Sequence, residues 1–207
     1  MSILPKITFH NLPDDKKQKL IQAAKKEFSR VPFYEASISN IVKQAKIPRG
    51  SFYQYFEDKE DAYYFLISEF VFDLNNQFVT ILKKHQGDLF ETMIEVFTLI
   101  IEEEENFYLL RNIFLNMTYK VEDKFSGIFR DHHSASRSFQ EISSYINKDT
   151  LNINEEKELY YVIQIISSVT FRNFVERFAK DLSNEEALNN YRMEINMLKQ
   201  GLARNKS

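Results

Sequence analysis

The positions of proline and glycine constrain the fold of this chain more than any other feature of its sequence. All four prolines lie within the first 48 residues, at Pro5, Pro13, Pro32 and Pro48. Beyond Gly50, the glycines are Gly87, Gly127 and Gly201. Both residue types interrupt helices, so we predict long helices over the last three quarters of the chain and short elements in the first quarter.

The composition limits the class of protein. The 207 residues include no cysteine, which excludes disulfides, thiolate nucleophiles and cysteine-based zinc sites. The N-terminus lacks the cationic and then apolar pattern of a signal peptide, and no run approaches the roughly 18 apolar residues of a membrane helix. We therefore expect a soluble, cytoplasmic protein without a membrane partner.

Charge is unevenly distributed along the chain. Residues 1–60 hold 11 Lys and Arg against 7 Asp and Glu, a balance of +4, whereas the remaining residues hold 16 against 23, a balance of −7. A basic N-terminal part on an acidic body suggests an anionic partner for the first part, although a solvated helical surface explains the same charges about as well.

The first 61 residues contain start signals for four helices. One helix is predicted to begin near Asp14 and to stop before Pro32. Ser37 suits the N-cap of a second helix, Pro48 the first turn of a third, and Asp58 the cap of a fourth, with Asp61 as a capping-box partner. The second helix has one apolar face, made of Ile38, Ile41, Val42 and Ala45.

The segment IPRGSFYQYF, residues 47–56, carries four aromatic rings and is predicted to be a short helix rather than a strand. Phe52 and Phe56 lie four residues apart and are expected to be buried, while Tyr53 points outward. Two short helices joined by a tight turn form a helix-turn-helix, whose second helix can enter the DNA major groove. Arg49 is placed to form a bidentate hydrogen bond with a guanine. Ser51 and Tyr53 are placed to form hydrogen bonds with phosphates.

The stretch LIQAAKKEFSRVPFYEASISNIVKQAKIPRGSFYQYFEDKEDAYYFL resembles the DNA-binding domain of TetR-family transcriptional regulators, over roughly residues 14–66. The matching positions are Ala23, Ala24, Phe28, Ser37, Ile41, Ala45, Tyr53, Tyr55, Phe56, Lys59 and Glu60. Lys46 stands where the family usually has a turn glycine, and Pro48 where it usually has a polar residue. A left-handed lysine costs about 1 kcal/mol relative to glycine.

The resemblance implies an all-α fold with a helix-turn-helix DNA-binding domain at residues 1–58 and a helical effector-binding and dimerisation domain at residues 59–207. It also implies a ligand-responsive regulator, a repressor that binds a palindromic operator as a homodimer and is released by a small, mostly hydrophobic effector. The expected DNA contacts are Ser37, Arg49, Gly50, Ser51, Tyr53, Tyr55 and Lys59. No cofactor, metal or catalytic residue is expected.

The rest of the chain is predicted to form helices at about 88–105, 106–121, 123–147, 154–181 and 183–202, with Gly87 ending the preceding helix and Asp88 and Glu91 forming a capping box. The last helix carries apolar residues at heptad spacing, which suits either a dimer seam or packing against its own domain. By resemblance we expect the dimer interface at Tyr161, Ile165, Val169, Leu188, Tyr191, Ile195, Leu198 and Leu202.

Aromatic and apolar residues are frequent in the body of the chain, where they are more often core than binding site. A site lined by such side chains would nevertheless suit an apolar effector, such as an acyl chain or a cationic drug. The candidate effector-binding residues are Phe97, Phe107, Arg111, Phe114, Met117, Phe129, Gln164, Ser168 and Phe171. Arg111 has an alternative role, as the partner of an acid among Glu102–Glu105.

Two rival functions remain open from the sequence. A helical interaction module can keep this fold without binding DNA. A helical metal-dependent enzyme is less favoured, because none of the four histidines has a glutamate three residues before it, and His132 and His133 are adjacent and point apart on a helix.

Overall fold

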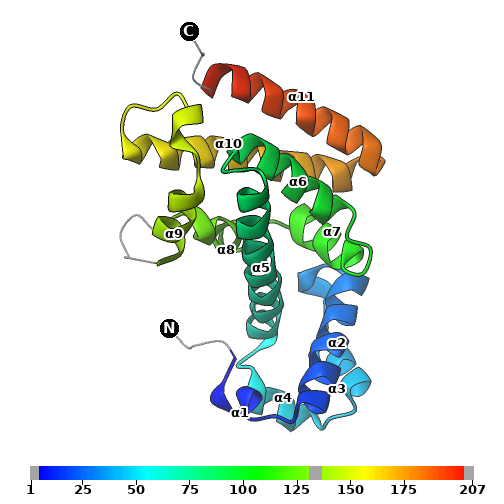
Figure 1. Ribbon diagram of the computed structural model, residues 1–207. Helices are drawn as coiled ribbons and strands as arrows, with labels where there is room; N and C mark the ends of the chain where they lie inside the picture. Colours follow the sequence, from blue (N-terminus) through cyan, green and yellow to red (C-terminus); the bar gives the residue numbers. More distant parts are fainter. Residues whose placement is uncertain (1–4, 131–136, 203–207) are drawn as a thin grey trace. The chain divides into compact units, whose positions relative to one another are not determined.

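The computed structural model describes residues 5–130 and 137–202, with side chains described at 5–125 and 140–201. Every regular element within these ranges is a helix, so the all-α prediction is confirmed (Figure 1). No helix in the described part is long and apolar enough to cross a membrane. The chain divides into two compact units, the described residues of Met1–Phe72 with Glu105–Val121, and those of Asp73–Glu104 with Glu122–Ser207.

The first unit is built from short helices followed by the start of a long one. Its elements are α1 (Ile7–His10), α2 (Asp14–Arg30), the 3-10 turn η1 (Phe33–Glu35), α3 (Ile38–Ala45), α4 (Arg49–Tyr55), the beginning of α5 (Lys59–Lys84) and α7 (Phe107–Leu115). The apolar stripe predicted for α3 is buried at Ile41, Val42 and Ala45 and half-buried at Ile38. Helix α2 carries a buried stripe of its own, which includes Leu20 and Phe28 at 2% exposure or less. Burial of these stripes packs α3 against α2.

A buried glutamate ties α2 to the start of α3. The carboxylate of Glu27 accepts hydrogen bonds from the Arg30 guanidinium at 2.9 and 3.0 Å, and from the Ser37 backbone N–H and Asn40 Nδ2, each at 2.9 Å. Burial by itself raises the pKa of Glu27, but these donors outweigh it and hold the pKa below its ordinary value. The four donors therefore keep an anion stable in the core and set where α3 begins.

Helix α7 belongs to the first unit by its contacts, although it lies far along the chain. It packs on α2, where the Asn112 side chain donates to the carbonyls of Phe28 at 2.8 Å and Ser29 at 3.0 Å. The domain boundary expected between residues 58 and 59 falls at the start of α5, whereas the compact units divide within α5.

The second unit is a bundle of longer helices. It contains the rest of α5, α6 (Leu89–Ile101), most of α8 (Tyr119–Arg130), α9 (Arg137–Tyr145), the turn η2 (Lys148–Thr150), α10 (Glu156–Ala179) and α11 (Asn184–Leu202). Helices α10 and α11 lie side by side and α6 packs on both (Figure 1). At the centre, the Phe97 ring stacks on Phe174 and Tyr191 with centroid separations of 4.7 and 4.2 Å.

Two of the predicted helices are divided in the structure. The helix predicted at 106–121 ends at Leu115, and α8 begins at Tyr119, where Thr118 Oγ1 accepts from the Val121 N–H at 3.3 Å and provides a new N-terminus. The helix predicted at 123–147 is split between α8 and α9, with residues 131–136 outside the described part. Thr118 was the available signal, because a threonine favours an N-cap over a helix interior.

The predicted helix stop at Gly87 is confirmed. Gly87 has φ +84°, and the Asp88 side chain caps α6 by accepting from the N–H groups of Phe90 and Glu91. The carboxylate of Glu91 does not complete a capping box, because it pairs with Lys199 of α11 at 3.1 Å. A β-carbon at Gly87 would lie 2.6 Å from the Tyr145 carbonyl oxygen and from the Asn147 nitrogen, so glycine is required for both reasons.

Candidate nucleic-acid interface and effector cavity

Helices α3 and α4 form the predicted helix-turn-helix. The turn passes through Lys46, whose φ of 56° and ψ of 43° are left-handed, as its position in place of a glycine suggested. Pro48 does not occupy the first turn of the next helix. It lies just before it with ψ 144°, so that α4 begins at Arg49 and places that residue at its leading edge.

The aromatic segment is divided between core and surface as predicted. Phe52 and Phe56 are 0% and 2% exposed, and their ring centroids lie 5.5 Å apart. Tyr53, one position along, is 39% exposed. The helical assignment of Phe56 was wrong, because α4 ends at Tyr55 and Phe56 follows in extended conformation.

The Arg49 guanidinium lies on the surface between the two helices. It donates to Ser39 Oγ on α3 and, at 3.4 Å, to the Tyr53 hydroxyl one turn further along α4. Ser39 was not among the predicted contacts. Its signal in the sequence was weak, since Ser37, two residues before it, carries the same hydroxyl at the N-cap position of α3. The three side chains form a polar cluster that spans both helices and is open to solvent.

Gly50 is exposed beside Arg49. A β-carbon at this position would meet nothing within 4 Å. Internal packing therefore gives no reason for a glycine here, and the surface of α4 is open at this point.

The remaining predicted DNA contacts are less exposed than expected. Ser37, Ser51 and Tyr55 are half-buried, and Ser37 occupies the N-cap of α3 without a side-chain capping bond. The Lys59 ammonium donates to the carbonyls of Tyr34 at 3.3 Å and Ala36 at 2.8 Å. Lys59 thus holds the loop before α3, and a phosphate would have to compete with these carbonyls.

Residues at the start of the chain support α4, which the sequence did not reveal. The Lys6 ammonium donates to the Tyr53 carbonyl at 2.9 Å, the Lys6 N–H to the Tyr55 carbonyl at 2.9 Å, and Thr8 Oγ1 to the Gln54 carbonyl. These bonds satisfy carbonyls that the end of a helix leaves unpaired. They also place a cation beside the exposed face of α4.

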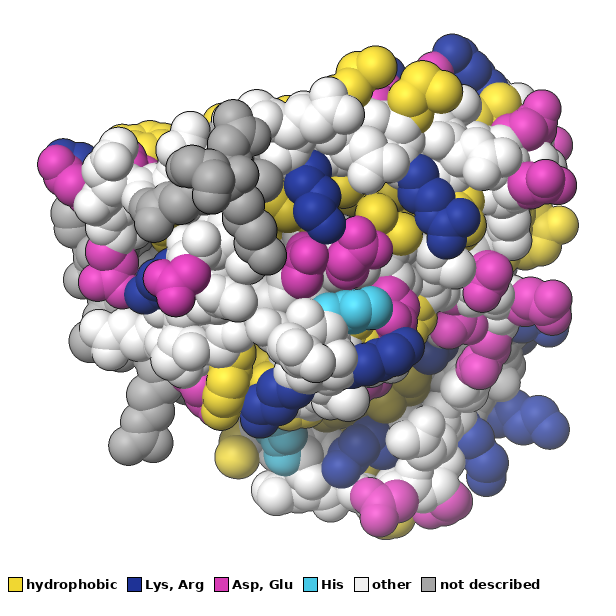
Figure 2. All heavy atoms as spheres, turned by 45° about the horizontal axis from the view of Figure 1, so that its top comes forward, with side chains coloured by type: hydrophobic (Ala, Val, Ile, Leu, Met, Phe, Trp, Pro, Cys, Tyr) yellow, Lys and Arg dark blue, Asp and Glu magenta, His cyan; other side chains and the backbone are white. Residues whose placement is uncertain are grey.

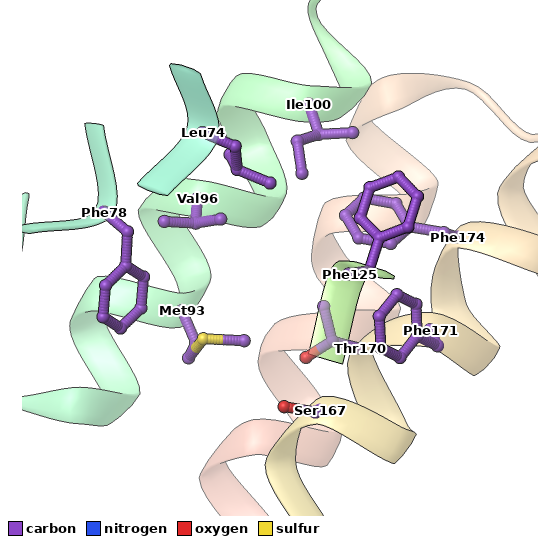
Figure 3. A pocket seen from close by; sticks show the side chains of 10 residues that line it. All are labelled: Leu74, Phe78, Met93, Val96, Ile100, Phe125, Ser167, Thr170, Phe171 and Phe174. Atoms are coloured by element: carbon purple, nitrogen blue, oxygen red, sulfur yellow. The ribbon is translucent and has the colours of Figure 1, made fainter. Parts of the chain in front are cut away.

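The second unit contains a small apolar cavity of about 50 Å³ (Figure 3). Its walls come from α5, α6, α8 and α10, and the hydroxyls of Ser167 and Thr170 lie on one side. The Thr170 hydroxyl is engaged by the Tyr191 hydroxyl at 2.7 Å. The lining residues are Leu74, Phe78, Met93, Val96, Ile100, Phe125, Ser167, Thr170, Phe171 and Phe174.

Of the predicted effector residues, only Phe171 lines this cavity. Phe97 lies in the core of the second unit, and Phe114 is 1% exposed in the first. Three further predicted residues, Phe107, Arg111 and Met117, belong to the first unit and do not line it. The predicted residue Phe129 lies outside the described side chains.

Two predicted polar effector residues are satisfied on the surface of α10. Gln164 donates to the Tyr160 hydroxyl at 2.9 Å, and Ser168 donates to the Gln164 carbonyl at 2.8 Å. Arg111 is half-buried on α7, and its expected pairing with an acid of Glu102–Glu105 stays a prediction. The cavity was missed because it is assembled from four helices that are distant in sequence.

The heptad seam of α11 packs largely inside its own unit. Tyr191 and Ile195 are both 0% exposed, so the prediction that they face a partner was wrong. Val169, Leu188 and Leu198 are half-buried, and the Leu202 side chain lies outside the described part. Helical spacing identified the apolar face but could not tell which surface it packs against.

A different set of apolar side chains is exposed on α10 and α11. Tyr161 and Ile165 are 58% and 42% exposed on α10, and Met193 and Met197 are 60% and 64% exposed on α11. Figure 2, which turns the α11 side forward, shows hydrophobic side chains reaching the surface among charged ones. We call these four residues the exposed apolar face.

The part of the chain that is described contains no cluster of side chains suited to a metal ion. No group of three His, Asp or Glu side chains there could hold a metal ion, and His132 and His133 lie outside the described residues.

Comparisons with known proteins agree with the helix-turn-helix. Residues 20–61 match the family model for bacterial regulatory proteins of the tetR family, and residues 88–202 match the tetracyclin repressor-like C-terminal domain. The chain is 41% identical over 56 residues to the uncharacterized HTH-type transcriptional regulator YdgC of Bacillus subtilis, and 37% identical over 60 residues to the HTH-type transcriptional regulator HbdR of Aromatoleum sp.. These matches span 27% and 29% of this chain, and only 29% and 26% of those proteins.

A solved structure shares the fold of most of the chain. FadR of Thermus thermophilus, a TetR-family repressor in complex with lauroyl-CoA, has a TM-score of 0.61 at 17% identity, covering 92% of this chain and 96% of that one. The likeness in fold extends through both units. Since a family model matches more than half of its length, this chain belongs to the TetR family of DNA-binding transcriptional regulators.

Proposed function

We propose that the protein is a repressor that binds a palindromic operator as a homodimer and is released by a small apolar effector. The observation that carries this proposal is the exposed Arg49 guanidinium at the leading edge of α4, held between Ser39 and Tyr53.

The position of Arg49 suits direct reading of a base. The N-terminal residues of a recognition helix reach base edges in the major groove, and a guanidinium can bond O6 and N7 of guanine together. The adjacent Gly50 lets the backbone of α4 approach the DNA, because its surface is open in the free protein. Tyr53, Ser51 and the ammonium of Lys6 are positioned near the same helix for phosphate contacts.

Dimerisation is proposed to use the exposed apolar face rather than the buried seam. Tyr161 and Ile165 are i, i+4 neighbours on α10, as are Met193 and Met197 on α11. The two helices are joined at their edge by the ion pair between Arg172 and Glu194. Large apolar side chains with this exposure mark an association surface, and a symmetric pair of α4 helices has to meet major grooves about 34–36 Å apart.

The cavity of the second unit is the proposed effector site. None of its lining residues is charged, so it suits an uncharged apolar group. Its volume of about 50 Å³ is too small for a long chain, and a ligand would have to bind an expanded state better than this one. The acyl-CoA held by the similar FadR structure supports an acyl chain as the class, with any charged head outside this cavity.

A gel-shift experiment tests the proposal. The wild-type protein first selects its site from random duplex DNA, and the recovered duplex is then titrated with protein at several salt concentrations and with lauroyl-CoA or a free fatty acid. The proposal expects a palindromic site, a steep fall in affinity with salt, and release by ligand. A chain that selects no site, or whose partner binding is independent of salt, would support the interaction module instead.

A further inference from the structure

A second and larger cavity, of about 630 Å³, lies within the first unit. Its walls are η1, the first turns of α5, and the segment that joins α7 to α8. Five of its lining side chains are aromatic, namely Phe33, Tyr34, Tyr63, Tyr64 and Tyr119. Its volume is within the range of roughly 300–1,000 Å³ that small-molecule sites occupy.

The aromatic residues form a floor and a rim. Tyr63 is 5% exposed and supplies the floor, while Tyr34 and Tyr119 are 70% and 73% exposed at the mouth. Burial raises the pKa of the Tyr63 hydroxyl, so the floor stays uncharged across the physiological range. The cavity therefore offers several neutral ring faces, which carry partial negative charge and attract cations.

The chain already places two ammonium groups against these rings. Lys59 Nζ lies 4.7 Å from the Phe33 ring centroid, and Lys120 Nζ lies 5.8 Å from that of Tyr64. Lys120 also pairs with Glu60 at 2.7 Å, and Glu60 is the one carboxylate among the lining residues that the structure describes. The site thus accommodates a cation in the structure as it stands.

The ammonium group of Lys120 can leave this position at small cost in free energy. Its side chain is 70% exposed and that of Glu60 is 43% exposed, and ion pairs this open to water are individually weak and screened by salt. When the lysine turns to solvent, Glu60 and the rings are left facing the cavity. The carboxylate would repel an anionic ligand, and an uncharged ligand would form no ion pair with it.

We propose that this cavity binds a compact organic cation, an ammonium group with apolar substituents, in exchange for the ammonium of Lys120. The site is separate from the cavity of the second unit, which has no charged lining residue. Its occupant would contact η1, the turn that Lys59 ties to α5 just before the helix-turn-helix. The proposal concerns ligand binding alone, so it stands or falls independently of the repressor role.

The test compares two probes of the same shape on the full chain. Phenyltrimethylammonium carries the charge, and tert-butylbenzene is its uncharged isostere. Binding is followed by ligand-observed NMR and by thermal shift at constant ionic strength. We expect saturable binding of the cation and markedly weaker binding of the isostere.

Substitutions at Glu60 and Lys120 are expected to change the affinity for the cation in opposite directions. Glu60→Gln removes the carboxylate and is expected to weaken cation binding roughly tenfold, while Lys120→Met removes the competing ammonium and strengthens it several-fold. Glu57→Gln makes the same charge change at an exposed position outside the lining and is expected to behave as wild type. Should Glu60→Gln fail to fold, Tyr34→Ala removes an exposed ring instead and should also weaken binding.

Three results would overturn the proposal: equal binding of the two probes, Glu60→Gln matching Glu57→Gln, or no saturation at millimolar cation. Affinity for the selected duplex is measured in parallel for every variant. A protein that binds the cation but no DNA would refute only the repressor role, and one that binds DNA but no cation would refute only this site.

Discussion

Replacing Arg49 by alanine removes the proposed base contact at small cost to the fold. In the free protein the guanidinium bonds only Ser39 and Tyr53 among the described residues, and all three side chains are exposed. Exposed hydrogen bonds of this kind contribute little, so the free energy of unfolding should change by less than about 1 kcal/mol.

The effect on operator binding should be much larger. A bidentate arginine–guanine pair contributes about 1–3 kcal/mol of discrimination, and a dimer carries two copies of α4. Loss of both pairs therefore costs about 2–6 kcal/mol, which corresponds to a fall in specific affinity of roughly 30-fold to 10⁴-fold. Arg49→Lys should recover only part of it, because lysine keeps the charge without the planar fork.

The assay is a gel shift on the selected duplex and on a scrambled duplex of the same length. The matched control is Arg192→Ala, which removes the same charge from an exposed position on α11. Both variants should bind the scrambled duplex about equally, and only Arg49→Ala should lose the selected one. If Arg49→Ala remains within a few-fold of Arg192→Ala on the selected duplex while its melting curve is unchanged, the base-contact argument is wrong.

Three further predictions concern the fold and the dimer. Glu27→Gln should lower the free energy of unfolding by about 1–3 kcal/mol at pH 7, because the donors around residue 27 lose the anion that they bond. Since the pKa of Glu27 is depressed from 4.5, the stability that the carboxylate contributes is present above that pH and is lost as the pH falls below it. Denaturant curves of the wild type and the variant should therefore converge in acid. Gly87→Ala should cost about 2–4 kcal/mol by calorimetry, since it strains a φ of +84° and places a β-carbon 2.6 Å from backbone atoms. Gly50→Ala is its control and should leave stability unchanged or raise it by up to about 1 kcal/mol, because its β-carbon is in open space within a helix. Ile165→Glu should raise the dissociation constant of the dimer at least about tenfold, as followed by light scattering, because it buries a charge in an apolar interface. Asn196→Glu, on the exposed surface of α11, should leave that constant unchanged. Equal behaviour of the two variants would exclude the exposed apolar face as the interface.

The local elements were predictable because their signals are local. Asp58 caps α5 through the Asp61 N–H at 2.9 Å, and Asp88 caps α6, both as their positions predicted. The capping box at Asp61 differs by one residue, since its carboxylate accepts from the Glu57 N–H rather than from that of Asp58. The helix-turn-helix also followed, because a left-handed turn at Lys46 and one apolar stripe on α3 need only short-range spacing.

The candidate sites were harder to predict because each side chain had more than one available partner. Lys59 resembled a phosphate ligand, yet its ammonium is held by the carbonyls of Tyr34 and Ala36. Ser39 carried no distinctive signal, although it lies against Arg49 in space. Contacts of this kind depend on where neighbouring helices are placed, and no spacing rule along one helix contains that information.

From the order of its residues, the chain could be identified as helical, most helix starts could be located, and α3 and α4 could be assigned to a DNA-binding motif resembling that of the TetR family. The packing of the helices was needed to learn that Tyr191 and Ile195 face their own core, that residues 105–121 join the first unit, and that the cavities described in the two units have different linings. The physical reason is that periodicity fixes which side chains share a face of a helix. What that face packs against is settled by the burial of apolar surface over the whole unit.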